Sequence, residues 1–320
     1  MTRSILRRSI APAAVVGAAT LVLAACGGQN SGGGGGGASG QVLVDGSSTV
    51  APLSNAAAEL FREQNSEVNV TVATSGTGGG FEKFCNGSTD ISDASRAIED
   101  DEKAACQQRG IEFVEIQVAN DAMTVVVNPQ NTWAKCLTVG QLETMWSPQS
   151  EGKVNNWNQV DPSFPDQPLN LFGPGTDSGT FDYFTEAING EEGASRPDYQ
   201  SSEDDNVLVQ GVQGAPGATS YFGYTYYEEN RESLEAVEVD GGQGCVAPSA
   251  QTVQDGSYAP LSRPLFIYVN KQSYTQKPQV KAFVDFYVQQ IDPIADAAQY
   301  VQLNEQQKGE LSEDRSALSG

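Results

Sequence analysis

Three short stretches rich in glycine and hydroxyl residues have the composition of a small-anion site. They are 46–52 (GSSTVAP), 75–81 (SGTGGGF) and 173–181 (GPGTDSGTF). Glycine lets the backbone approach a ligand closely, and serine and threonine hydroxyls add hydrogen-bond donors. These residue types therefore favour a small oxyanion held by many neutral donors.

Each stretch follows a predicted strand and comes before a predicted helix. Runs typical of β-strands precede the stretches at 42–44, 68–73 and 169–172, and helical patterns cover 52–63 and 178–188. At a helix N-terminus the first backbone N–H groups are unpaired, and the helix dipole favours negative charge. In open α/β sheets, ligands bind at this carboxyl end of the strands. We therefore expect the three stretches to form one site.

The alternative for any single stretch is an ordinary helix N-cap. Three such junctions in one chain favour a shared ligand site over three separate caps. A dinucleotide or nucleotide site fits less well, because none of the stretches reads G-x-G-x-x-G and no segment reads as a Walker A loop.

Strand and helix signals alternate along the rest of the chain. Further β-rich runs stand at 111–118, 122–127 and 265–270, and 279–291 has the pattern of an amphipathic helix. This alternation predicts an α/β fold with a mostly parallel sheet.

Composition excludes several classes of protein. The chain has 320 residues, which suggests two globular units, and its formal net charge of -23 argues against binding to nucleic acid or to anionic lipid. It contains no histidine, which removes Ser-His-Asp and Cys-His nucleophile systems and the usual zinc and iron ligand sets. We predict no catalytic residue, no metal and no cofactor.

The alternatives to a binding protein are two classes of enzyme and one class of non-enzyme. The segment Thr176-Asp177-Ser178 is similar to the nucleophile segment of alkaline phosphatases, but the metal sites of those secreted phosphomonoesterases need histidine. Ser178 is not the centre of a G-x-S-x-G elbow, and neither Ser75 nor Ser178 begins an S-x-x-K motif of a Ser-Lys hydrolase. A surface adhesin or signalling module would bind no small anion tightly.

Four motifs in order resemble one known family. GSSTVAP, SGTGGGF, STDISDASR and GPGTDSGTFDYF are similar to motifs of the phosphate-binding lipoproteins (PstS) of bacterial phosphate ABC transporters, over about residues 41 to 310. The resemblance implies a two-lobed periplasmic-binding-protein fold of type II, with the ligand between lobes that close around it. It also implies a monomer that passes phosphate to the permease subunits; another oxyanion, sulfate-like or molybdate-like, is the alternative ligand. The predicted ligand set consists of Ser48, Thr49, Val50, Ser75, Gly76, Thr77, Ser178, Gly179 and Thr180 on the basis of the resemblance, together with Arg96 and Asp177 on the basis of their own chemistry.

The sequence departs from the family pattern at two positions. Arg96 stands where the family has an acidic acceptor, and Pro174 stands where it has an arginine. Arg96 can therefore supply the bidentate guanidinium that phosphate prefers. The alternative for Arg96 is a surface salt bridge with an acidic neighbour, and the candidates are Asp93, Asp100 and Asp101.

The departure leaves open which carboxylate accepts the proton of a hydrogenphosphate. Asp177 is the first candidate and Asp93 the second. A protonated phosphate donates to such an acceptor, whereas fully ionised sulfate would face it unpaired. The alternative for Asp177 is a helix N-cap beside Ser178.

The N-terminus indicates export. Arg3, Arg7 and Arg8 precede an apolar segment at 10–25, which is too short for a membrane span of about 20 residues. Leu23-Ala24-Ala25-Cys26 resembles a lipobox, so we expect cleavage after residue 25, a lipid on Cys26 and a location at the outer face of the cell membrane. The alternatives are an ordinary signal peptide and, for the export route, a twin-arginine signal.

A domain plan follows from these features. Residues 1–25 form the signal peptide and 26–40 a glycine-rich tether. The first lobe comprises 41–121 and 267–320, and the second lobe 122–266, with crossings near 119–123 and 259–266.

Four cysteines remain after Cys26, namely Cys85, Cys106, Cys136 and Cys245. An even number in an exported chain suggests two disulfides, for which three pairings are possible. We favour Cys85–Cys106 and Cys136–Cys245, because neighbours along the chain close the shorter loops. Free buried thiols are the alternative.

Overall fold

The structure is a computed structural model that describes residues 38–176, 178–202 and 204–319. The predicted signal peptide, Cys26, most of the tether and Asp177 lie outside the described residues. The strands are β1 (Gly40–Gly46), β2 (Val68–Thr74), β3 (Ile91–Ala94), β4 (Phe113–Val127), β5 (Cys136–Thr138), β6 (Asn170–Gly173), β7 (Gln200–Ser201), β8 (Ala218–Gly223), β9 (Glu235–Ala236), β10 (Glu238–Asp240), β11 (Cys245–Val246) and β12 (Ser262–Asn270).

Helices connect most of these strands. They are α1 (Ala51–Arg62), α2 (Gly76–Cys85), α3 (Asp100–Gln108), α4 (Val139–Trp146), α5 (Trp157–Val160), α6 (Gly179–Asn189), α7 (Asp205–Gln213), α8 (Tyr224–Asn230), α9 (Ala250–Gln254), α10 (Lys271–Gln276), α11 (Pro278–Gln289), α12 (Ile291–Ala297) and α13 (Glu305–Ala317), with a short 3₁₀ turn at Pro148–Ser150. The α/β class expected from the sequence is confirmed. In the described residues, no helix has the length and apolar character needed to cross a membrane.

The main sheet is mixed, so the expected mostly parallel sheet is wrong. Its strand order is β2-β1-β3-β12-β4-β8-β6-β7. The flanking blocks β2-β1-β3 and β8-β6-β7 are parallel within themselves. Strands β4 and β12 lie between them and are antiparallel to each other and to their outer neighbours, because the chain runs out along β4 and returns along β12.

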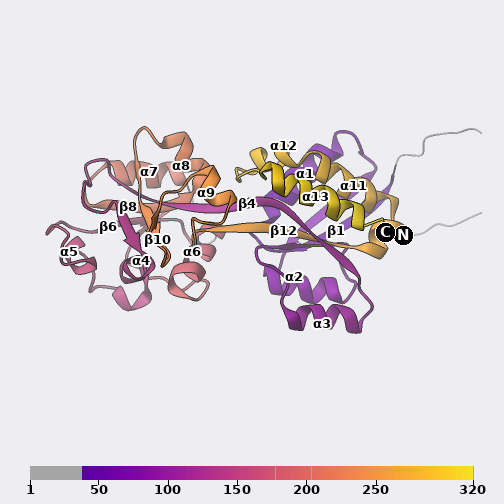
Figure 1. Ribbon diagram of the computed structural model, residues 1–320, viewed down its shortest axis with the longest axis horizontal. Coiled ribbons are helices and arrows are strands. Elements are labelled where there is room, and N and C mark those ends of the chain that lie inside the picture. Colours follow the sequence, from indigo (N-terminus) through magenta and orange to yellow (C-terminus); the bar gives the residue numbers. More distant parts are fainter. Residues whose placement is uncertain (1–37, 177, 203, 320) are drawn as a thin grey trace, which may run out of the picture. The chain divides into compact units, whose positions relative to one another are not determined.

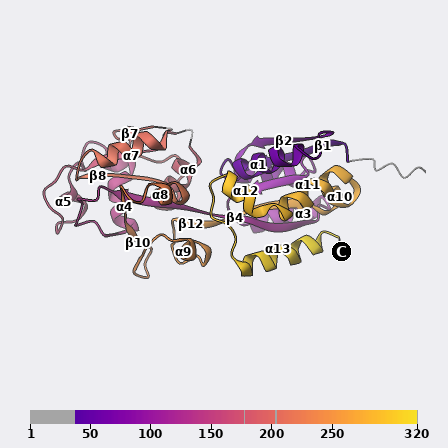
Figure 2. The same cartoon turned by 90° about the horizontal axis from the view of Figure 1, so that it is seen from above.

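Strand β4 joins two runs that the sequence separates, 111–118 and 122–127, into a single strand of 15 residues. Figure 1 and Figure 2 both show β4 and β12 side by side, as their register requires. In that register Arg263 of β12 is the partner of Asp121 of β4. Two residues of opposite charge therefore face each other across the paired strands.

Two large hydrophobic clusters meet at this pair of strands. One contains Val42, Leu53 and Phe283, and it draws on residues up to Ala119 and from Leu265 onward. The other draws on Ala122 to Leu261, with Val301 added from the C-terminal segment. In Figure 1, α1 and α11 lie on one side of β1 and α2 and α3 on the other. The expected lobe boundaries stay a prediction, which a hinge measurement can test.

Both expected disulfides are confirmed. Cys85 at the end of α2 is bonded to Cys106 of α3, and Cys136 of β5 is bonded to Cys245 of β11. The first bridge ties α3 to the helix that follows the second glycine-rich stretch.

Candidate functional site

Two cavities converge on the loop between β1 and α1. The smaller, about 40 Å³, is bordered by Ser47, Ser48 and Thr49 and by Gly76 and Thr77. The larger, about 180 Å³, shares Ser48 and Thr49 with the first, and α6 supplies Gly179 and Thr180. The three glycine-rich stretches therefore come together around Thr49, although they are far apart in the sequence.

Close backbone contacts explain two of the glycines. A Cβ on Gly46 would lie 2.0 Å from the Asp93 carbonyl oxygen, and the φ of Gly46 is +148°. A Cβ on Gly80 would lie 2.5 Å from the Gly46 Cα. A side chain on Gly46 would collide with the backbone of β3, and one on Gly80 would push α2 away from the end of β1. Gly80 therefore lets the first two stretches come together.

Thr49 is held from three sides. Its N–H donates to Ser47 Oγ at 3.2 Å, and its carbonyl accepts from Tyr300 Oη at 2.7 Å. Its Oγ1 accepts from Arg263 Nη2 at 3.0 Å. Because a threonine hydroxyl also carries one proton, Thr49 can still donate to a ligand while it accepts from Arg263. Val50, the next residue, is fully buried in the core.

The second stretch is organised by Asp45, the penultimate residue of β1. Ser75 Oγ donates to Asp45 Oδ1 at 2.7 Å, and Lys83 Nζ donates to Oδ2 at 2.5 Å. Burial alone would raise the pKa of Asp45, but these two hydrogen bonds lower it below the ordinary value. Ser75 borders neither cavity. Thr77 does, and its Oγ1 accepts from the Ser95 N–H at 3.3 Å.

The third stretch begins α6. Ser178 caps this helix, and its Oγ accepts from the Thr180 N–H at 3.2 Å. A Cβ on Gly179 would lie 3.4 Å from Thr49 Oγ1, so the N-terminus of α6 packs directly against Thr49. The positive end of the α6 dipole therefore points at the cavities.

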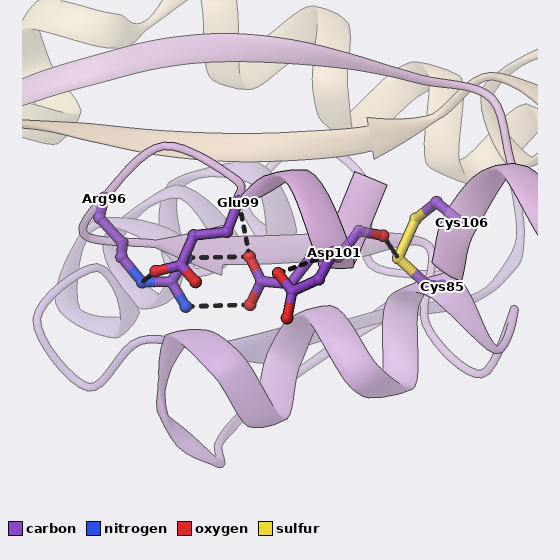
Figure 3. Close-up of a disulfide and its surroundings, with 6 residues drawn as sticks. Cys85, Arg96, Glu99, Asp101 and Cys106 are labelled. Carbon is purple, nitrogen blue, oxygen red and sulfur yellow. Dashed lines mark hydrogen bonds and ion pairs between the residues drawn. A yellow bond between two sulfur atoms is a disulfide. The ribbon is translucent and has the colours of Figure 1, made fainter. Parts of the chain in front are cut away.

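Arg96 lies outside both cavities. Its two terminal nitrogens each donate to one oxygen of Glu102 at 2.9 Å, and its Nε lies 3.4 Å from Glu99 Oε1. Figure 3 shows Arg96 beside Glu99, with the Cys85–Cys106 disulfide farther along α3. The hydrogen bonds that Arg96 donates to Glu102 are the main reason why the pKa of Arg96 is raised.

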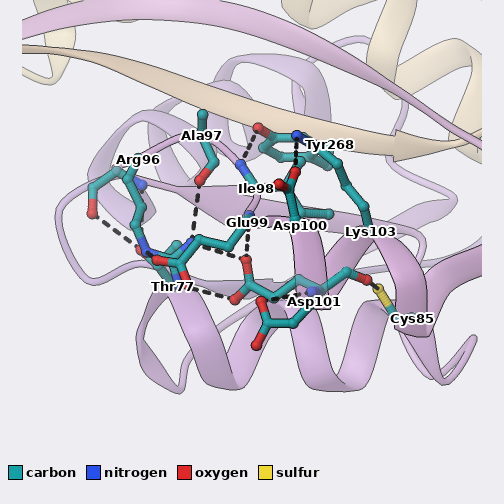
Figure 4. Close-up of polar contacts among 12 residues, drawn as sticks. Thr77, Cys85, Arg96, Ala97, Ile98, Glu99, Asp100, Asp101, Lys103 and Tyr268 are labelled. Atoms are coloured by element: carbon teal, nitrogen blue, oxygen red, sulfur yellow. Dashed lines mark hydrogen bonds and ion pairs between the residues drawn. The ribbon is translucent and has the colours of Figure 1, made fainter.

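The salt-bridge partners expected for Arg96 from the sequence are Asp93, Asp100 and Asp101. In the structure it pairs with Glu99 and Glu102 instead. The reason is the capping box of α3, in which Glu102 also accepts from the Glu99 N–H at 2.8 Å. Figure 4 shows this network of Arg96, Glu99 and Asp101 around the start of the helix. The anion-binding role of Arg96 stays a prediction.

Asp93 is fully buried behind the first loop and borders neither cavity. Its Oδ1 accepts from Ser54 Oγ at 2.8 Å, and its Oδ2 has no hydrogen-bond partner among the described residues. Burial is the main reason that its pKa is raised to about 8, with the charge of Asp45 adding to the effect. Asp93 is therefore poorly placed to receive a proton from a ligand in either cavity.

The sequence reasoning missed Arg263, which borders the smaller cavity. Its Nε lies 3.4 Å from Asp121 Oδ2, its Nη1 lies 3.7 Å from Glu186 Oε2, and its Nη2 donates to Thr49. The guanidinium carbon lies 3.5 Å from the centroid of the Tyr183 ring. A signal was present, because Asp121 and Arg263 are charged residues within the two predicted crossing segments.

The smaller cavity also has an acidic side. Asp182, Glu186 and Glu192 border it from α6 and the following turn. Burial raises the pKa of Asp182, and the nearby charge of Glu192 raises it further. Arg263 thus shares its cavity with several carboxylates.

Comparisons with known proteins place this geometry in context. A model of the PBP superfamily domain matches residues 32–290. The chain is 47% identical to protein SphX of Synechocystis sp. over 84% of its own length and 80% of that protein. It is 39% identical to the phosphate-binding protein PstS of Staphylococcus saprophyticus over 87% of its length and 84% of that protein. The crystal structure of a possible phosphate binding protein from Planctomyces limnophilus matches with a TM-score of 0.84 and 45% identity, covering 88% of this chain and 100% of that one.

Proposed function

Because the chain belongs to the PBP superfamily, and within it to the PstS-like phosphate-binding proteins, we propose that it captures inorganic phosphate and delivers it to the permease of an ABC transporter. Proteins of this family bind solutes and are not enzymes, which agrees with a site that lacks histidine. The family membership supports phosphate as the ligand, and delivery to a permease is part of the proposal.

The observation that carries this proposal is the convergence of three glycine- and hydroxyl-rich stretches on Thr49. An anion beside Thr49 would meet its hydroxyl, backbone N–H groups of the surrounding loops and the N-terminus of α6. Neutral donors of this kind bind an oxyanion without a large positive field, so the net charge of -23 does not oppose binding. The proposed ligand set from the loops is Ser48, Thr49, Val50, Ser75, Gly76, Thr77, Ser178, Gly179 and Thr180.

Calorimetric titration of the purified protein tests the proposal. We expect phosphate to bind with one site per chain, sulfate and molybdate to bind more weakly, and a chromogenic phosphate ester to remain uncleaved. Thr49→Val keeps the shape of the side chain but removes its hydroxyl, and we expect it to weaken phosphate binding about 10-fold or more, the usual range for a hydrogen bond to a charged group. Thr71→Val, on β2 and outside both cavities, is the matched control.

A folded protein that gives no heat with phosphate would refute the function. Tighter binding of sulfate or molybdate than of phosphate would reassign the ligand to another oxyanion.

We further propose Asp177 as the acceptor of the ligand's proton. In the sequence it directly precedes Ser178, the cap of α6. Asp177→Asn should raise the affinity for sulfate relative to phosphate, because the amide can donate where the carboxylate repels. Unchanged selectivity in a competition titration would shift the acceptor role to another carboxylate at the cavity, such as Asp182.

The location of the protein is part of the same proposal. A basic N-terminus, a short apolar segment and the lipobox-like sequence before Cys26 support export and a lipid anchor at the outer face of the cell membrane. The glycine-rich stretch at 27–40 would then serve as the tether between the anchor and the folded body.

A further inference from the structure

Two arginines lie near the candidate site, and their hydrogen-bonding states differ. The guanidinium of Arg96 already makes a bidentate pair with Glu102, and Glu102 is itself held by the Glu99 N–H. An anion could recruit Arg96 only by breaking this pair and the capping box of α3. The contacts of Arg96 therefore make it part of the start of a helix.

Arg263 is more deeply buried and already faces the loops. Its side chain is 13% exposed, compared with 36% for Arg96. Its Nη2 contacts Thr49 Oγ1, the residue on which all three glycine-rich stretches converge. A guanidinium at this position adds a full positive charge to a site otherwise made of neutral donors.

The neighbours of Arg263 fix its orientation. Asp121 lies against Nε, and the Tyr183 ring stacks on the guanidinium face. Tyr183 is in turn anchored, because its hydroxyl donates to the Pro260 carbonyl at 2.8 Å. The guanidinium plane is therefore held in place, with Nη1 and Nη2 left to meet a ligand.

The remaining partner of Arg263 is weakly held. Glu186 Oε2 lies 3.7 Å from Nη1, which is beyond hydrogen-bonding distance, and the Glu186 side chain is 57% exposed. Glu186 extends from α6 and can turn toward solvent. Its carboxylate occupies the side of Arg263 where an oxyanion would make its second hydrogen bond.

We propose that Arg263, rather than Arg96, supplies the guanidinium that binds the oxyanion, and that the oxyanion displaces Glu186 from it. The inference rests on the proposed function. In the complex, Nη1 and Nη2 donate to the anion, and Thr49 adds its hydroxyl proton. Asp121 acts as a positioning residue that fixes Arg263 without contacting the ligand. Glu186 competes with the ligand and so sets its affinity.

Calorimetric titration of phosphate into four single variants of the full chain tests the assignment. Arg263→Gln should lower the affinity about 30-fold or more, because a buried charged partner of the anion is lost. Arg263→Lys keeps the charge beside Asp121 but loses the planar fork, so only part of the affinity should return. Arg96→Gln should weaken binding far less than Arg263→Gln. Arg231→Gln, at an exposed arginine, is the control for total charge.

Three further variants separate the effect on binding from effects on folding and from the general effect of removing a charge. The double variant Arg263→Gln/Asp121→Asn also removes the buried charge that pairs with Arg263, so a melting temperature near that of the wild type would show that its lost affinity belongs to the site. Glu186→Gln should raise the affinity about 2- to 5-fold, the size expected for an exposed ion pair. Glu191→Gln, an exposed residue that borders neither cavity, removes the same charge nearby and should change the affinity less.

The outcomes distinguish this assignment from the proposed function. If the wild type binds phosphate and the folded Arg263 variants bind it equally well, the assignment of Arg263 is wrong, whereas the proposed function stands. A large loss with Arg96→Gln and none with Arg263→Gln would restore the role predicted from the sequence. Absence of binding by the folded wild-type protein would overturn both.

Discussion

Asp93 is the residue whose burial has the clearest consequence for stability. Its pKa is raised to about 8 in the folded protein, chiefly by burial, from an ordinary value of 3.8. Between about pH 4 and pH 8 the folded protein keeps a proton that the unfolded chain has lost. The free energy of unfolding should therefore fall as pH rises through this window, by at most about 1.4 kcal/mol per pH unit, and level off above it.

Asp93→Asn should remove this dependence and make the protein more stable than the wild type at pH 8. Urea denaturation at pH 5 and at pH 8 measures the effect. Asp90→Asn is the matched control, because Asp90 is also buried but accepts from Lys277 and Ser273, so its loss should lower stability at neutral pH. Equal pH dependence in the wild type and in Asp93→Asn would contradict the argument.

At the scale of elements, two disulfides cross-link segments that are separate in the sequence. Cys85–Cys106 spans 21 residues and joins α2 to α3, and Cys136–Cys245 spans 109 residues and joins β5 to β11. A cross-link stabilises mainly by limiting the unfolded chain, and the effect grows with loop length.

The double variant Cys85→Ser/Cys106→Ser should therefore lose about 3 kcal/mol of unfolding free energy, and Cys136→Ser/Cys245→Ser about 5 kcal/mol. Chemical denaturation without reductant gives both values. Reducing agent should destabilise the wild type and leave a protein with all four serines unaffected. Wild-type stability in both double variants would show that neither cross-link limits the unfolded chain.

At the scale of the whole molecule, the paired strands β4 and β12 are where a hinge is expected. Within the described part of the main sheet, these two strands connect the two large core clusters. A ligand that contacts both Thr49 and α6 would favour the closed arrangement. Small-angle scattering should therefore show a smaller radius of gyration with saturating phosphate. At phosphate concentrations too low to saturate Thr49→Val, the radius of gyration of this variant should not change. Identical wild-type profiles with and without ligand would rule out a large closure.

Membrane attachment is the second prediction at this scale. If Cys26 carries the lipid, Cys26→Ser should move the protein from the membrane fraction to a soluble fraction, because no apolar segment of adequate length would hold it there. Fractionation followed by immunoblotting measures this shift, and Cys85→Ser, a cysteine in the folded body, is the control. Retention of the Cys26 variant in membranes would remove the anchor from the proposal.

Local patterns predicted much of the fold. Strands β1, β2, β6 and β12 and helices α1, α6 and α11 stand within about three residues of their predicted bounds, because each has a continuous apolar run or a clear helical period. Strands β3 (ISDA) and β8 (ATSYFG) were missed. Both are buried in the middle of the sheet but carry serine, threonine or aspartate, so their sequences do not resemble buried strands.

The sequence by itself determined the three glycine-rich junctions and the family, because these depend on residue types at short or fixed spacings. It favoured the disulfide pairing that the structure contains, out of three that were possible. Only the tertiary structure decided which arginine faces the site. Arg96 lies in one of the four family motifs, yet its guanidinium donates to Glu102 of the α3 capping box. Arg263 is 142 residues from Asp121 and 214 from Thr49. Pairing of β4 with β12 brings these residues together, and no spacing along the chain encodes it.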